Sequence, residues 1–510
     1  MNLVGRKSAP SRFRIGAASL AMILWLAPSP DALALKNLVT APLTVTDVQN
    51  VIARAVTQAM HNNEAVTIAI SDREGNVLGV FIMTGAAANA AKPDPINQAQ
   101  PGGTLASATA IEKARTAAFL SSDQNAFSTR TGFFITQSHF PPNVADQPQG
   151  PLFGLGFSSL PCGDVQLHGN GITIAFGGIP LYKNKQIAGG IGVEGASTAD
   201  EDEIIALAGT SGSYSVPQSI TADKILLNGI RLQYVAQPLG KHFKPLPFAS
   251  LRGMVDPTFP IIATPPTSFP LVTIAGASGE LRFPIIDSPM PGPTKLFASD
   301  VTSIMTNSIR QARNTRAAIR LPIGVPARMQ VGITDVDGNI LGVFRTNDAT
   351  MFSLDIVIQK ARSVSVFSDP TQTLGMEIRQ ELGVPVTSQI AFTTRTLGFL
   401  AQPFYPPGID GTSRGPLFEI QEMLYSAHPT APCEPNGNGV TLFPGSAPLY
   451  KDGMLVGGVG LSGGGVDQDD FITAGGTPGY EPSDSIKADQ ITFRGTPLPY
   501  LKFPRQPTLH

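Results

Sequence analysis

The same stretch of sequence occurs twice in this 510-residue chain. Residues 177–195 read "GGIPLYKNKQIAGGIGVEG", and residues 445–463 read "GSAPLYKDGMLVGGVGLSG". Internal repetition constrains the fold more than composition does, because both copies must form the same supersecondary structure. The chain is therefore expected to contain two equivalent modules.

Further matches follow in the same order in both copies. "DREGNVLGVF" at residues 72–81 matches "DVDGNILGVF" at residues 335–344, and the tail "ITADKILLNGIRLQYV" from Ile220 matches "IKADQITFRGTPLPYL" from Ile486. Shorter pairs are "EKAR" with "QKAR", "FSTRT" with "FTTRT", and "GPLF" with "GPLF". A repeat of roughly 200 residues is far longer than a solenoid unit, so the sequence indicates tandem duplication of a whole module.

Each copy predicts an alternation of helices and hairpins. "LTVTDVQNVIARAVTQAM" has apolar residues at helical spacing, with Thr46 as the expected N-cap and Asp47 at the positive end of the helix dipole. "VTIAIS" and "VLGVFIM" predict a hairpin whose turn needs the positive φ that Gly75, or Gly338 in the second copy, supplies. A helix over "SATAIEKARTAAFL" and the repeated Pro-Leu-Tyr-Lys hairpin complete the module. The fold class is therefore α+β, with two antiparallel-sheet modules and flanking helices.

The duplication also suggests how the modules are arranged. An antiparallel sheet with helices on one side leaves a face or an edge exposed, and pairing of two such sheets would cover it. One chain would then form the contact that a single-copy protein obtains by dimerising. We expect an intrachain pseudo-dimer.

The N-terminus has the layout of a secretory signal. Basic residues precede the apolar run "IGAASLAMILWLA", and Ala32-Leu33-Ala34 forms an A-x-A cleavage site. An uncleaved anchor is the alternative. Since no later run is apolar enough to cross a bilayer, the mature protein is expected to be periplasmic or secreted, with no membrane span.

The expected domains follow from the signal and the repeats. They are a signal peptide at 1–34, a first module at 43–237, a proline-rich linker at 238–297 and a second module at 298–504. "LVTIAG" and "LRFPII" in the linker are short strand candidates, so we expect an ordered strap. The formal net charge is −2, which argues against a nucleic-acid partner.

The ordered set "VTIAISDREGNVLGVFIMTGA", "EKARTAAF" and "GGIPLYKNKQIAGGIGVEG" resembles the GlcG/HbpS-type haem-binding family. The first copy matches the family pattern fully. The second departs from it, with "FRTNDA" in place of the Met-x-Gly-Ala strand end. The resemblance implies a compact, self-associating α/β module that binds haem or a related tetrapyrrole. It also allows an extracytoplasmic protein partner, and a corrinoid or no ligand in place of haem.

Cys162 and Cys433 are the two cysteines of the chain, and they stand at corresponding places in the copies. In an exported protein such a pair favours a disulfide, here between the halves. Two free thiols, or thiolate ligation of haem or a metal, are the alternatives. No C-x-x-C-H occurs, which excludes a covalent c-type haem.

Five residues are candidates for holding the cofactor. Haem iron usually takes a histidine or thiolate ligand, which nominates His139, His168 and His428; for each, a hydrogen-bonding loop histidine is the alternative. Arg130 and Arg395 occupy matching "[ST]-T-R-T" motifs, where a guanidinium could hold haem propionates or tie loop carbonyls together. No catalytic residue is nominated.

Other motifs favour structural roles. Lys113 and Lys360 on the second helix of each copy are expected to be solvated or paired with acids. "GGIGVEG" lacks the spacing of a nucleotide loop, so its glycines are expected to permit close strand packing or the approach of a flat ligand.

The sequence therefore predicts an exported haem-binding protein that sequesters, transfers or senses haem. A haem-degrading or haem-dependent redox enzyme is the first alternative. A structural or interaction protein without a ligand is the second.

Overall fold

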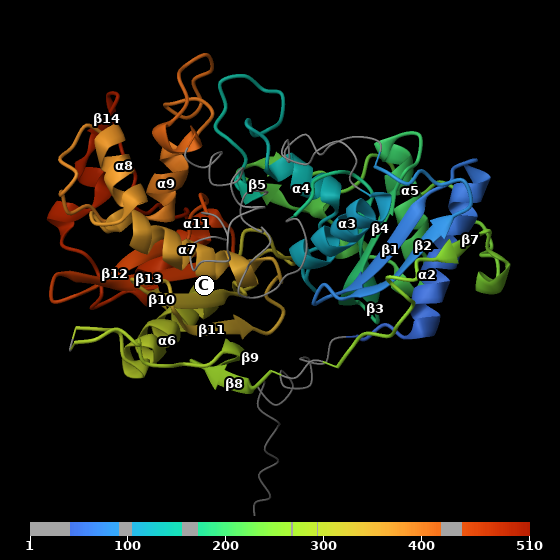
Figure 1. Ribbon diagram of the computed structural model, residues 1–510, viewed down its shortest axis with the longest axis horizontal. Helices are drawn as coiled ribbons and strands as arrows, with labels where there is room; N and C mark the ends of the chain where they lie inside the picture. Colours follow the sequence, from blue (N-terminus) through green and yellow to red (C-terminus); the bar gives the residue numbers. More distant parts are fainter. Residues whose placement is uncertain are drawn as a thin grey trace, which may run out of the picture.

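The protein consists of two halves, each built around one antiparallel sheet (Figure 1). The computed structural model describes residues 41–90, 105–155, 172–266, 269–292, 294–419 and 441–509. The first half is coloured blue to green and the second yellow to red in Figure 1. The predicted α+β class and the pseudo-dimer of two like modules are both confirmed.

The two sheets have the same core order. The first runs β3 (Gly178–Lys183), β4 (Gln186–Glu194), β1 (Thr67–Asp72), β2 (Val77–Met83) and β7 (Gly253–Val255). The second runs β12 (Ser446–Lys451), β13 (Met454–Ser462), β10 (Gln330–Asp335), β11 (Ile340–Thr346), β9 (Ala277–Phe283) and β8 (Leu271–Ile274). The strands β7, β8 and β9 come from the linker. They extend both sheets at corresponding edges, which makes the linker an ordered part of the fold.

The helices repeat in the same way. The first half has α2 (Val45–His61), α3 (Ala106–Leu120), α4 (Thr129–Ile135) and α5 (Ala199–Thr210), and the second has α6 (Ala298–Asn314), α7 (Ser353–Ser368), α8 (Thr373–Glu381), α9 (Thr394–Leu400) and α11 (Val466–Gly476). Short hairpins close the tails: β5 (Leu226–Leu227) with β6 (Ile230–Arg231), and β14 (Thr492–Phe493) with β15 (Thr496–Pro497). The helix α8 has no counterpart in the first half, where residues 121–128 alone connect α3 to α4.

The N-cap of the first helix is Thr44, two residues before the predicted Thr46. Asp47 at the third helical position accepts a hydrogen bond from the Thr44 backbone at 2.8 Å, and the Thr44 hydroxyl accepts one from the Asp47 backbone at 3.2 Å. This reciprocal capping box satisfies two backbone donors at once, so the helix begins at Val45, directly after Thr44. Asp47 also binds Lys183 Nζ and the Tyr214 hydroxyl, each at 2.7 Å.

Glycines on β4 allow a helix to lie directly on the sheet. A Cβ added at Gly192 would stand 1.9 Å from the Ala110 carbonyl oxygen of α3, and one at Gly190 would stand 2.0 Å from that of Ala114. Ile191 points to the other face, where it meets Gly209 of α5. These glycines therefore permit the close approach of the α3 backbone, which is neither the strand packing nor the flat ligand that the sequence suggested.

Helices of its own half cover both faces of each sheet. The seam is consequently not the sheet-on-sheet contact that the sequence suggested. The halves meet through helix ends and loops, and one apolar cluster continues from the first half to Val343, Phe352 and Phe443 of the second. The backbone amide of Phe352 donates to the Phe119 carbonyl at 3.3 Å, and that of Leu321 donates to the Gln124 carbonyl at 2.9 Å.

Candidate functional site at the seam between the halves

A buried charge network joins the halves around Asp348, which follows β11. Its carboxylate lies 3.1 Å from Arg320 Nη1 and 3.4 Å from Arg73 Nη2, and it accepts a hydrogen bond from the Asp123 backbone at 2.8 Å. Arg320 is fully buried; burial lowers its pKa to about 10, so it stays charged at neutral pH. The network has no symmetric copy, because Gly85 stands where the first half would place an equivalent of Asp348.

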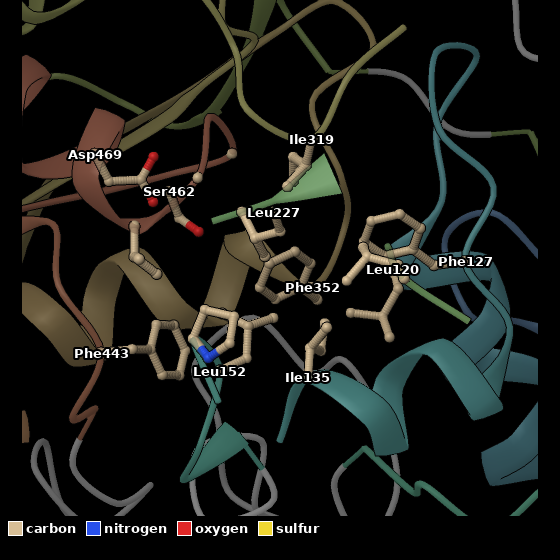
Figure 2. A pocket seen from close by; sticks show the side chains of 15 residues that line it. Leu120, Phe127, Ile135, Leu152, Leu227, Ile319, Phe352, Phe443, Ser462 and Asp469 are labelled. Carbon is tan, nitrogen blue, oxygen red and sulfur yellow. The ribbon is translucent and has the colours of Figure 1, made fainter. Parts of the chain in front are cut away.

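An apolar cavity of about 40 Å³ lies at the seam, lined by residues of both halves. Figure 2 shows Leu120 and Phe127 of the first half at one end, Phe352 in the middle, and Ser462 and Asp469 of the second half at the other end. A water molecule needs about 10–15 Å³ of such a cavity, so the volume is enough for a few waters. A tetrapyrrole does not fit in it.

A much larger cleft, of about 790 Å³, also lies at the seam. We call it the seam cleft. Its basic lining residues come from both halves, and a single carboxylate, Asp467, accompanies them. The basic residues are Lys224, Arg316, Arg320, Lys502 and Arg505. On a chain whose net charge is −2, this is a local concentration of positive charge.

Exposed apolar side chains stand among these cations. Ile323 is 79% exposed, Leu226 is 57% exposed and Phe503 is 53% exposed. All three line the seam cleft. Large apolar side chains left in water together mark a binding surface more often than scattered ones do.

Three segments, besides residues 466–468 of α11, build the seam cleft. The first is the tail at 224–228, next to β5. The second is the connection between α6 and β10, which spans residues 315–329, whereas α2 and β1 in the first half are joined by residues 62–66 alone. The third is the C-terminal segment 502–505. Figure 1 shows β5 and α11, whose residues contribute to the lining, near the boundary between the halves.

His139 lies at a second contact between the halves. Its Nε2 is 2.7 Å from Asp410 Oδ1, its ring packs against Phe404 at 5.8 Å, and the hydrogen bond lowers the pKa of Asp410. Asp146 and Asp410 exchange backbone-to-carboxylate hydrogen bonds at 3.2 and 3.0 Å, a reciprocal pattern typical of a twofold contact. As an iron ligand, His139 would have to use Nδ1, which lies 3.3 Å from the Ser138 hydroxyl, or give up Asp410.

Arg130 binds carboxylates of its own half. It forms ion pairs with Asp200 and, at 2.8 Å, with Glu203 of α5, and it lies over the Phe176 ring at 3.8 Å. These partners occupy the fork of the guanidinium, so a haem propionate would have to compete with them.

Arg395 repeats this arrangement with α11. It lies 2.7 Å from Asp470 and 2.6 Å from Asp467. Burial acts to lower its pKa, but the two carboxylates outweigh burial and raise it. In both halves the arginine fastens the "[ST]-T-R-T" helix to the last helix of the module.

The remaining candidates, His168, His428, Cys162 and Cys433, lie outside the described residues. Within the described part of the chain, no group of three or more histidine, cysteine or acidic residues is placed to hold a metal ion. None of the described helices is long and apolar enough to cross a membrane.

The paired lysines of the second helix are buried. Lys113 lies 2.6 Å from Glu194 and 2.9 Å from Asp202, and the two acids raise its pKa against the effect of burial. Lys360 keeps one such partner, Asp469 at 3.6 Å, and burial lowers its pKa to about 8.

The difference between the lysines has a simple cause. Ser462 in β13 stands where β4 has Glu194, so the second half lacks one of the two carboxylates. The prediction of an acid partner holds for both lysines, and the structure adds that neither is solvated.

A family model described as "Haem degrading protein HbpS-like" matches residues 97–211 and 309–476. These two segments together make up more than half of the chain. The chain belongs to the HbpS-like family. The model matches once in each half, as expected for a tandem duplication of an HbpS-like module.

Several solved structures are similar to about a third of this chain. The Klebsiella pneumoniae protein ORFY is 24% identical over 33% of this chain and 88% of its own, with a TM-score of 0.23. The structure titled PduOC:Heme complex is 22% identical over 37% of this chain and 97% of its own, with a TM-score of 0.24. HbpS is 23% identical over 33% of this chain and 86% of its own, with a TM-score of 0.21. No curated protein matches the chain.

Proposed function

We propose that this protein is an exported haem-binding protein that sequesters, transfers or senses haem or a related tetrapyrrole. The observation that carries the proposal is membership of the HbpS-like family, whose description names haem, in both halves of the chain. The N-terminal signal pattern supports export to the periplasm or the exterior.

The described residues offer a fitting location. A haem has a flat apolar ring and two carboxylates, and the seam cleft combines exposed apolar side chains with basic ones over about 790 Å³. The small apolar cavity does not have the room. When bound, haem would supply visible absorbance and redox chemistry, while the chain would supply charge pairing and burial.

Haem degradation is the second candidate function, because the family description itself contains the word "degrading". Incubation of the haem-loaded protein with ascorbate and oxygen separates the two. With a binding protein the Soret band decays no faster than that of free haem in the same solution, whereas a degrading enzyme bleaches the band faster and releases a linear tetrapyrrole.

The proposal is tested by titrating the signal-less protein with haemin. A saturable Soret shift at one or two equivalents is the expected result. Alanine variants of His139, His168 and His428 then identify any histidine ligand of the iron, since loss of a ligand moves the Soret band. If the Soret band stays that of free haemin at all protein concentrations, haem binding is refuted and an interaction role without a ligand is favoured.

A further inference from the structure

Two arginines of the seam cleft have no carboxylate partner among the described residues. Arg316 donates to the Arg505 backbone carbonyl at 3.5 Å, and no ion pair among the described residues involves the Arg505 side chain, whereas Lys502 lies 3.0 Å from Asp467. By contrast, Lys224 pairs with Asp223 at 2.6 Å. Unpaired guanidiniums at the rim of a concave site are available for the carboxylates of a ligand.

A further unused donor lies deeper in the seam cleft. Arg320 lines the cleft, and its buried Nε has no hydrogen-bond partner. A buried donor without an acceptor costs about 1–3 kcal/mol, so such groups are rare unless they serve a purpose. An anionic ligand or the water that it orders would satisfy this donor.

The basic and apolar residues that line the seam cleft are not repeated at the equivalent positions of the other copy. In the aligned tails, Lys224 and Leu226 have Gln490 and Thr492 as counterparts. The connection that carries Arg316, Arg320 and Ile323 has no counterpart in the shorter first-half connection at 62–66. The second copy has polar residues at the positions equivalent to Lys224 and Leu226, so the fold does not require a basic or an apolar side chain there. The combination of basic and exposed apolar residues therefore occurs in the seam cleft and not at the equivalent place in the other half.

The described lining of the seam cleft contains no histidine, cysteine, methionine or tyrosine. It therefore provides no usual protein ligand for iron. Recognition there must depend on carboxylate pairing and apolar contact.

We propose that the seam cleft binds the tetrapyrrole by its two carboxylates and its ring, without ligation of the metal. Arg316 and Arg505 pair with the carboxylates, and Ile323, Leu226 and Phe503 cover the ring. This inference rests on the proposed function and assigns its site. It also predicts that metal-free porphyrin binds as well as haem does.

The test compares three ligands on the protein after signal removal. Haemin is followed by its Soret band, and protoporphyrin IX and its dimethyl ester are followed by porphyrin fluorescence in the same detergent. Protoporphyrin IX is expected to bind within about threefold of haemin, and the ester, which lacks both carboxylates, at least about tenfold more weakly.

Variants then locate the site. Arg316→Glu/Arg505→Glu is expected to weaken protoporphyrin binding by at least about tenfold. The control Lys244→Glu/Arg310→Glu reverses two exposed charges outside the cleft lining and is expected to leave affinity unchanged. A third variant, Ile323→Ser/Phe503→Ser, should weaken all three ligands together. Circular dichroism establishes that each variant is folded.

Each outcome decides between the claims. Tight haemin binding that survives the Arg316→Glu/Arg505→Glu change overturns the seam-cleft site and leaves the proposed function intact. Haemin binding without protoporphyrin binding also overturns it, because iron ligation would then be required. If the ester binds as well as the diacid, the carboxylate pairing is wrong, and this comparison needs no variant. If no tetrapyrrole binds at all, the proposed function itself fails.

Discussion

Removal of one charge at the seam should destabilise the whole protein. Asp348 is the carboxylate that Arg320 and Arg73 share across the seam. Its backbone φ is 63°, a left-handed conformation that asparagine also tolerates. Asp348→Asn therefore removes the negative charge while it keeps the shape and the backbone preference.

The expected cost follows from the burial of Arg320, whose side chain is 0% exposed. A buried pair that loses one partner typically costs about 3–5 kcal/mol, because the other charge stays buried and unpaired. Asp123 lies in the same network, and burial followed by repulsion from Asp348 raises its pKa. With Asp348 neutral, Asp123 compensates in part, so we expect about 3 kcal/mol.

Urea unfolding followed by circular dichroism measures this effect. The matched control is Asp410→Asn, which changes a partly exposed contact between the halves and should leave the urea midpoint nearly unchanged. Weaker coupling between the halves should also split the unfolding of Asp348→Asn into two transitions. A loss below about 1 kcal/mol with one sharp transition would show that the network does not hold the halves together. Addition of Arg320→Met to Asp348→Asn should recover part of the lost stability, since no unpaired buried charge then remains.

Two further predictions concern the module itself. Gly192→Ala places a methyl group against the Ala110 carbonyl and should lower the free energy of unfolding by about 1–3 kcal/mol, measured by thermal unfolding. The control is Gly240→Ala, where the added Cβ has open space and stability should be nearly unchanged. Equal effects of the two substitutions would contradict the packing argument. Asp47 has its pKa lowered to about 2: burial acts to raise it, but the hydrogen bonds, that of Lys183 foremost, outweigh burial. The stability that this lowered pKa provides is present above about pH 4 and is lost as the pH falls toward 2. Asp47→Asn should therefore flatten the pH dependence of the melting temperature between about pH 4 and pH 2. If the melting temperature of the variant falls with pH as steeply as that of the unchanged protein, Asp47 is not the group responsible. Because Asp47 is partly exposed, the effect at neutral pH is expected to stay near 1 kcal/mol.

Local patterns predicted the elements well and their boundaries less well. Apolar periodicity and turn glycines predicted the first helix, both hairpins and the second helix of each copy, because those signals act between residues close in sequence. The N-cap was misplaced by two residues, since Thr44 and Thr46 both precede Asp47 closely and only the reciprocal hydrogen bonds distinguish them.

The candidate site was harder to predict from the sequence than the helices and strands. The sequence suggested that Arg130 and Arg395 hold propionates or loop carbonyls, whereas the structure pairs them with carboxylates that lie about 70 positions further along the chain. The seam cleft was missed. One signal was available: the alignment of the two copies shifts between the first helix and "VGITD", which marks residues 315–329 as an addition to the second copy.

The sequence by itself determined that this chain contains two α+β modules of one family in tandem, since the repeated motifs impose the same local structure twice. Only the tertiary structure decided how the modules meet. Each sheet is already covered by its own helices, so the seam is built from helix ends, an inserted connection and the two tails. Such contacts join residues far apart in sequence, and no periodicity within one segment records which distant segment will face it.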